Sequence, residues 1–227
     1  MSHVSQLSAT LSAADSLLTV LVGLAALGLV ISRQMAALLR LFMAQSILLA
    51  GSATVLAVGL PSEHLYFFAA TTIGTKVVLI PLVLRAVATR EIYAEREIDQ
   101  VLSIPLALLV AAVLAIVAWT LVRPLAVDLG DSTLVLHVSV GAVVLLFGAF
   151  TVAVRREAVA QLFGLLVMEN GALLAGIALV PNLNAIVEVG VAIDVPVIAL
   201  VVGLLIRTIH EEIGSTRVGY LRELKDG

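Results

Sequence analysis

The chain has 227 residues, of which 61% are hydrophobic and 13% charged, and its formal net charge is −3. Soluble domains are about 45–50% apolar and 25% charged, so lipid must be the solvent for most of this chain, which excludes a soluble enzyme. The slightly negative charge excludes a nucleic-acid binder. The absence of cysteine excludes disulfides, iron–sulfur clusters and thiolate zinc sites, and we expect neither a cofactor nor a metal site.

Apolar stretches long enough to cross a bilayer follow one another along the chain. A hydrocarbon core about 30 Å thick is crossed by roughly 20 helical residues, and backbone polar groups in lipid must pair within the segment. The sequence therefore predicts an all-α membrane protein, with residues 1–227 as a single integral membrane domain. The seven predicted transmembrane helices are Ala14–Ile31, Met35–Val58, Tyr66–Arg85, Val101–Val122, Thr133–Val154, Ala158–Val180 and Ala185–Ile206.

The basic residues predict the orientation, because lysine and arginine concentrate in cytoplasmic loops. In the seven-helix arrangement Arg123 falls on one side and Lys76 lies within a span. We therefore expect the N-terminus outside, and a cytosolic loop at 86–100 and tail at 207–227. The other eleven basic residues share the cytoplasmic side: Arg33, Arg40, Arg85, Arg90, Arg96, Arg155, Arg156, Arg207, Arg217, Arg222 and Lys225.

Residues 14–90 and 133–208 follow a similar plan, which suggests a parallel repeat of two three-helix units joined by the fourth helix. The second helix of each unit carries a polar residue followed by LLAG, at Leu48–Gly51 and Leu173–Gly176. The third helix of each unit contains a proline, Pro81 or Pro196. Chance similarity between two apolar sequences is the alternative explanation.

Four ionisable residues inside the predicted spans carry most of the information, because a charge there costs a few kcal/mol or more. Lys76, Glu169 and Asp194 lie near the middles of the third, sixth and seventh helices. Glu188 precedes Asp194 by six residues, about 9 Å along a helix. Buried groups of this kind can exchange protons near physiological pH, so we predict a proton relay. The alternative is a buried ion pair, Lys76 with Glu169 or Asp194, that only holds helices together.

Other residues support this predicted relay without taking a catalytic role. Pro81 and Pro196 each remove one helical hydrogen bond close to a charged residue, which can admit water. Gln45 and Asn170 lie within spans, where hydrogen bonds between helices are their expected role. His137 lies near the outer end of the fifth helix, and we interpret it as an interfacial residue with a structural role.

In length and helix order nearly the whole chain resembles the hydrogenase-4 component E family, the small membrane subunit of formate hydrogenlyase-type, group 4 nickel–iron hydrogenases, and the motifs specific to this family lie in the last third. The resemblance is carried by Met168–Gly171 (MENG), by Glu188 and Asp194, and upstream by Thr75–Leu84 (TKVVLIPLVL). This family is similar to the K subunit of complex I, in which a buried glutamate stands in the pattern GLEIMIN. Here the glutamate position is Leu166, and the acid follows about one helical turn later.

The resemblance implies a non-catalytic, proton-conducting or coupling subunit in the membrane arm of a respiratory complex. Its partners would be antiporter-like membrane subunits and a hydrogenase- or quinone-proximal membrane subunit, in a bacterial or archaeal cytoplasmic membrane. Glu169 and Asp194 would carry protons, Lys76 would modulate them, and Glu188 would connect the relay to the outer half. The alternatives are a stand-alone transporter or channel and a purely structural spacer. A retinal-type photoreceptor is disfavoured because the intramembrane lysine is in the third helix.

Overall fold

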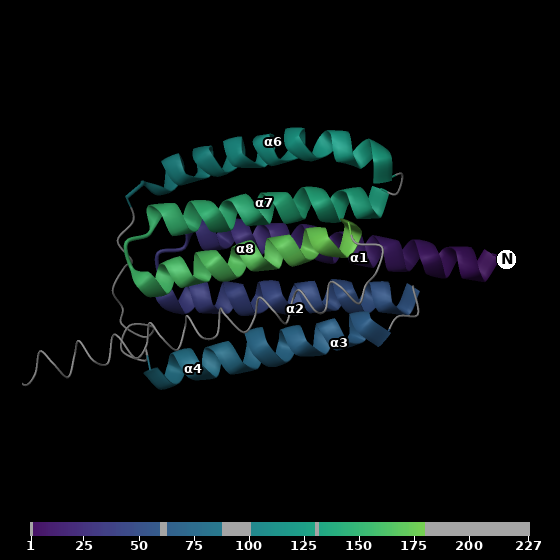
Figure 1. Cartoon of the computed structure of the whole chain (residues 1–227), viewed down its shortest axis with the longest axis horizontal. Coiled ribbons are helices and arrows are strands. Elements are labelled where there is room, and N and C mark those ends of the chain that lie inside the picture. Colours follow the sequence, from purple (N-terminus) through teal and green to yellow (C-terminus); the bar gives the residue numbers. More distant parts are fainter. Residues whose placement is uncertain (1, 60–62, 88–100, 130–131, 180–227) are drawn as a thin grey trace, which may run out of the picture.

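Helices make up almost all of the computed structural model, which describes residues 2–59, 63–87, 101–129 and 132–179 (Figure 1). Within these ranges no strand occurs. The elements are α1 (Ser2–Ile31), α2 (Met35–Gly59), α3 (Glu63–Thr72), the π-helix η1 (Ile73–Leu79), α4 (Ile80–Val87), α6 (Ile104–Leu129), α7 (Ser132–Val154) and α8 (Ala158–Leu179).

Six of the seven predicted transmembrane helices are confirmed as helices long and apolar enough to cross a membrane. The third of them is one continuous span formed by α3, η1 and α4. The seventh predicted helix, Ala185–Ile206, lies outside the described residues, and with it lie Glu188, Asp194 and Pro196. The internal repeat stays a prediction for the same reason, because its second unit ends with that helix.

Several helix ends differ from the sequence prediction, and three of them are informative. The first helix begins at Ser2 rather than Ala14. The prediction began at Ala14 because it followed the apolar stretch, and the first turns of the helix are polar. The third span begins at Glu63, where an acidic side chain suits the positive end of the helix dipole. The fourth predicted helix continues through Pro124 to Leu129.

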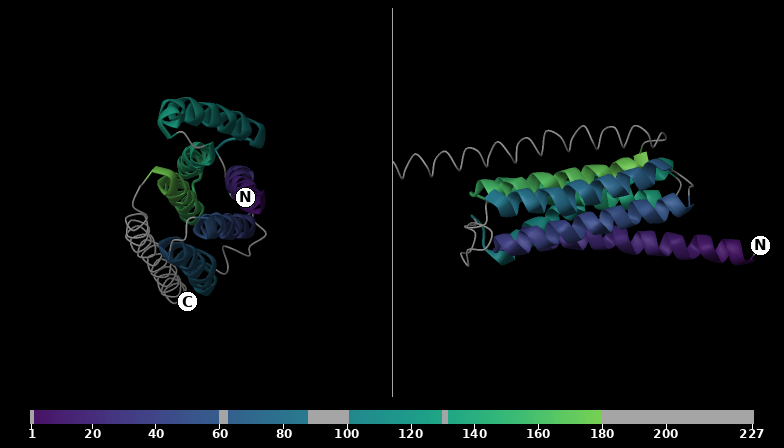
Figure 2. Two further views of the ribbon diagram at one scale, coloured as in Figure 1. Left: turned by 90° about the vertical axis from the view of Figure 1, so that its right-hand side faces the viewer. Right: turned by 90° about the horizontal axis from the view of Figure 1, so that it is seen from below.

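The helices form a bundle in which consecutive spans run in opposite directions (Figures 1 and 2). Helix α1 packs on α2 and α7, and α2 also packs on α3 and α8. Helix α6 lies on the outside of the bundle, against α7 and α1. Only 17% of the residues in its apolar window are buried, against 61% for α8, so most of the surface of α6 is not covered by the other described helices. We call the end of the bundle where α1 begins the N-terminal side.

Glycines allow α7 and α8 to approach closely. A Cβ atom at Gly171 would lie 2.6 Å from the carbonyl oxygen of Gly141, and one at Gly148 would lie 2.6 Å from that of Gly164. Each helix therefore contributes two glycines, seven residues apart, to a seam where only glycine fits. Small residues at such seams are typical of membrane helix pairs, which associate by packing and not by hydrophobic burial. The seam fixes the rotation of α8 and so the direction of its polar residues.

Candidate functional site

A buried ion pair lies in the middle of the bundle. The Lys76 Nζ of η1 lies 2.9 Å from the Glu169 Oε1 of α8, and the exposed fractions of the two side chains are 0% and 3%. Of the two partners that the sequence allows for Lys76, the described part of the chain therefore supplies Glu169. The ion pair is compatible with both predicted roles, because two groups at hydrogen-bond distance can hold helices together or pass a proton.

Amide and hydroxyl side chains extend the ion pair into a network across four spans. Lys76 Nζ donates a hydrogen bond to Asn170 Oδ1 at 2.9 Å. Asn170 Nδ2 donates to Gln45 Oε1 at 3.1 Å and to Ser46 Oγ at 3.3 Å, both on α2. Gln45 Nε2 donates in turn to the carbonyl oxygen of Val22 on α1, at 3.3 Å. These interhelical hydrogen bonds are the role expected for Gln45 and Asn170, and we call the whole set the central network.

The hydrogen bonds of the central network have one consistent direction. Because the Asn170 amide nitrogen donates to α2, its oxygen is turned toward Lys76. An amide oxygen accepts a hydrogen bond from an ammonium or from a neutral amine, so Asn170 can hold Lys76 in either protonation state. The arrangement thus permits a proton to move between Lys76 and Glu169 without loss of the lysine's position.

The π-helix places Lys76 in this network, and Pro81 follows directly after it. The N–H of Ile80 bonds to the carbonyl oxygen of Thr75, five residues earlier, as in a π-helix. Pro81 has no N–H group and interrupts the helical hydrogen bonding at the next position. The sequence predicts that Pro81 removes one helical hydrogen bond. In the structure the helix widens into a π-helix just before the proline. Single π-turns within α-helices are frequent at functional sites.

A second buried cluster lies nearer the N-terminal side. The His137 Nε2 of α7 lies 3.4 Å from the Asp15 Oδ2 of α1 and 3.2 Å from the Ser52 Oγ of α2. Ser52 Oγ also donates to Asp15 Oδ1 at 2.5 Å, and Thr19 Oγ1 lies 3.3 Å from His137 Nε2. Asp15, Ser52 and His137 are fully or almost fully buried. We call these four residues the outer cluster.

Within the outer cluster the side chain of His137 is wholly enclosed by protein, and its interfacial, structural role stays a prediction. The carboxylate that encloses it, Asp15, is the residue that sequence reasoning missed. Asp15 lies close to the predicted start of the first helix at Ala14, where polar residues are common. Its spacing from Thr19 could have indicated a polar face of this helix, since side chains four residues apart lie on the same helix face.

Arg155 anchors the opposite end of the bundle, directly after α7. Its Nη2 donates to the carbonyl oxygens of Leu29, Val30 and Ser32, at the end of α1. These carbonyls have no helical partners and carry the negative end of the dipole. Burial, with a smaller contribution from the positive charge of Arg33, lowers the pKa of Arg155 to about 10. The guanidinium therefore keeps its charge at neutral pH.

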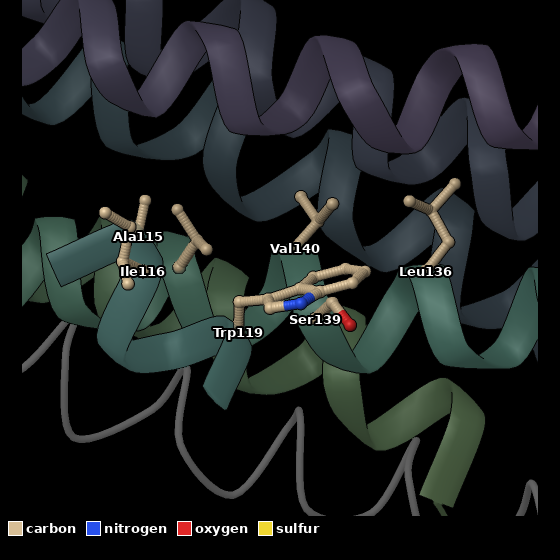
Figure 3. A pocket seen from close by; sticks show the side chains of 7 residues that line it. Ala115, Ile116, Trp119, Leu136, Ser139 and Val140 are labelled. Atoms are coloured by element: carbon tan, nitrogen blue, oxygen red, sulfur yellow. The ribbon is translucent and has the colours of Figure 1, made fainter. Parts of the chain in front are cut away.

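An open groove of about 360 Å³ lies between α6 and α7, away from both polar clusters (Figure 3). Its polar side chain, Ser139, donates its hydroxyl to the Val135 carbonyl oxygen of its own helix, so the groove offers no free reactive group there. Within the described ranges no group of three or more histidine, aspartate or glutamate residues is placed to hold a metal ion. The groove is lined by Ala115, Ile116, Trp119, Leu136, Ser139, Val140 and Val143.

The chain is similar to proteins of several bacteria. It is 30% identical over 193 residues to "Hydrogenase-4 component E" of Escherichia coli K12 and to the protein of that name in Shigella flexneri, covering 80% of this chain and 83% of each relative. It is 26% identical over 215 residues to the "Uncharacterized protein Rv0085" of Mycobacterium tuberculosis, covering 92% of this chain and 97% of the relative. No family model and no solved structure matches the chain.

Proposed function

Because the chain belongs to the hydrogenase-4 component E family, we propose that it is a non-catalytic, proton-conducting or coupling subunit in the membrane arm of a group 4 hydrogenase or complex I-like complex. Antiporter-like membrane subunits and a hydrogenase- or quinone-proximal membrane subunit are its partners. The chemistry of hydrogen or formate turnover belongs to other chains of the complex.

The central network is the observation that supports a role in proton movement. An acid and a base lie 2.9 Å apart in the bundle interior, and an amide network holds the base. Glu169 and Asp194 carry the proton in this proposal, Lys76 sets the proton affinity of Glu169, and Glu188 connects the relay to the outer half. Charged groups are retained inside membrane spans mainly where they serve ion or proton pathways.

The orientation is proposed from the arginines. Arg33, Arg40, Arg155 and Arg156 lie at one end of the bundle, where α1 and α7 end. Arg123 lies on the N-terminal side, near the end of the apolar span of α6. By the positive-inside rule, the N-terminal side faces out of the cell and the chain's C-terminus is cytoplasmic.

A Glu169→Gln substitution tests the relay in the assembled complex. Glutamine keeps the size and one acceptor of the side chain but cannot carry a proton, so the number of protons moved per electron should fall strongly. The measurement combines a pH-sensitive dye in membrane vesicles with the rate of electron transfer. Glu63→Gln is the matched control, because Glu63 is exposed at the start of α3 and should leave the ratio unchanged.

Two outcomes contradict the proposal. An unchanged ratio in Glu169→Gln supports the structural spacer, which the interhelical position of the ion pair also favours. Proton movement by the chain purified alone in liposomes supports a stand-alone transporter. Partial recovery with Glu169→Asp, which restores a carboxylate one methylene shorter, would strengthen the relay.

A further inference from the structure

We propose that Asp15 and His137 form a second proton-binding site, which exchanges a single proton with the N-terminal side of the bundle. The site is separate from the central network, and it does not depend on Glu169 carrying protons. It is argued from the hydrogen-bond geometry of the outer cluster.

One nitrogen of His137 has a fixed role. Its Nδ1 lies 2.8 Å from the carbonyl oxygen of Thr133, one turn earlier on α7. A carbonyl oxygen can only accept a hydrogen bond, so Nδ1 carries the hydrogen. Any change in the charge of the imidazole therefore takes place at Nε2, which faces Asp15, Ser52 and Thr19.

The surroundings of Nε2 call for one proton. The Ser52 hydroxyl already donates to Asp15 Oδ1, so its hydrogen is not available to Nε2. The Thr19 hydroxyl, 3.3 Å away, can donate to Nε2, but it does not neutralise the carboxylate. Without a further proton, the negative charge of Asp15 would be buried 3.4 Å from Nε2, which is costly. One proton, held either by Nε2 or by Asp15 Oδ2, removes this penalty. Its uptake changes the charge of the pair from −1 to 0.

Among the described residues, Asp15 is the charged group that faces the His137 imidazole. The helices packed around His137 are taken in turn. Helix α1 supplies Asp15 itself, and α2 faces the imidazole with the neutral hydroxyl of Ser52. Helix α8 supplies Glu169, which is paired with Lys76 deeper in the bundle. Helix α6, which also packs on α7, carries Arg123 on its exposed surface.

On α1 and α2 the outer cluster lies toward the N-terminal side of the central network. Asp15 precedes Val22 by seven residues on α1, and Ser52 follows Gln45 by seven residues on α2, which is about 10 Å at 1.5 Å per residue. Thr19 of the outer cluster comes nearer, since it precedes Val22 by three residues, about 4.5 Å. The carboxylate of Asp15 and the Lys76–Glu169 ion pair therefore lie at different levels of the bundle.

Polar groups lead from the outer cluster toward the N-terminal side. The Thr133 residue that binds Nδ1 also places its hydroxyl 3.1 Å from Ser12 Oγ, and Ser12 is exposed. Toward the helix starts, the hydroxyl groups of Thr133 and Ser12 reach the surface of the bundle. The geometry thus points to proton exchange through this end of the bundle.

Histidine NMR on the full-length chain in lipid bilayers tests the site. The chain has four histidines, and replacing His3 and His210 by glutamine leaves His137 together with the exposed His64 as an internal reference. We expect the His137 signal to change with pH, and Asp15→Asn, which removes the carboxylate beside Nε2, to move the midpoint of that change by about tenfold in proton concentration. The His64 signal should be unchanged.

Two results would overturn the second site: a His137 signal that stays constant between about pH 4 and pH 10, or the same midpoint with and without Asp15. Ser52→Ala keeps both titratable groups but removes the hydrogen bond to Asp15, so its midpoint should differ from that of the unaltered chain; this variant covers the case in which Asp15→Asn fails to fold, and an unchanged midpoint in it would overturn the site. Glu169→Gln should leave the His137 midpoint unchanged, so failure of the proposed relay and failure of this site are separable.

Discussion

At the scale of single residues, the bundle contains charges whose cost in an apolar interior is met by specific partners. Lys76 has a carboxylate and an amide oxygen at 2.9 Å, and Arg155 has three carbonyl oxygens at the end of α1. Removal of one member of such a set leaves the other buried without compensation, which costs about 3–5 kcal/mol. Each partner therefore affects stability more than its own contacts suggest.

A double substitution in the central ion pair measures the cost of leaving one buried charge without its partner. Lys76→Met should destabilise the protein by about 3–5 kcal/mol because Glu169 loses its countercharge. Adding Glu169→Gln removes the remaining charge, so the double variant should be more stable than Lys76→Met alone. Thermal unfolding of the three proteins in one detergent measures the order. A double variant less stable than the single one would show that the carboxylate is not charged in the folded bundle.

At the scale of helices, the α7–α8 seam holds the central network in register. A Cβ at Gly171 would lie 2.5 Å from the backbone nitrogen of Leu145 and 2.6 Å from the Gly141 oxygen. Backbone atoms cannot move aside as a flexible side chain can, so the two helices would have to separate. Because Glu169 and Asn170 directly precede Gly171, the seam controls their approach to Lys76.

Alanine at Gly171 should therefore lower the free energy of unfolding by about 1–3 kcal/mol, as overpacking does. Gly176 on the same helix is the matched control, since a Cβ there meets nothing within 4 Å. Gly176→Ala should be neutral or slightly stabilising because alanine is the better helix former. The comparison is made by thermal unfolding in the same detergent, and equal losses in both variants would refute the role of the seam.

The sequence is sufficient to locate the spans and the polar residues within them, because a bilayer demands long apolar helices and makes Lys76, Glu169 and Asn170 conspicuous. It gives their depth along each helix but not the direction in which they point. The pairing of Lys76 with Glu169 depends on the rotation of α8, which the glycine seam sets. Asp15 was missed for a different reason, since it is the second residue of the predicted helix, where a charge can reach water, whereas α1 begins earlier, at Ser2.

At the scale of the whole molecule, the proposed orientation can be measured directly because the chain has no cysteine. Ser5→Cys lies on the N-terminal side of α1, and Gln34→Cys lies in the exposed turn between α1 and α2. A membrane-impermeant maleimide added to intact cells should label Ser5→Cys, and Gln34→Cys only after permeabilisation. Both substitutions leave the basic residues in place, so the topology signal is retained. The reverse pattern would invert the proposed orientation.

The long sequence separation of the central ion pair has a consequence for synthesis of the protein. Lys76 precedes Asn170 by 94 residues, and Glu169 is the residue directly before Asn170. Translation of this stretch takes roughly 5 to 20 s at cellular rates. A lysine at the centre of a span costs about 2.5–3.5 kcal/mol on insertion, and its own apolar neighbours, with a mean hydropathy of 1.9, must offset this alone. Biogenesis therefore includes an interval of seconds in which Lys76 has been made and its carboxylate partner has not.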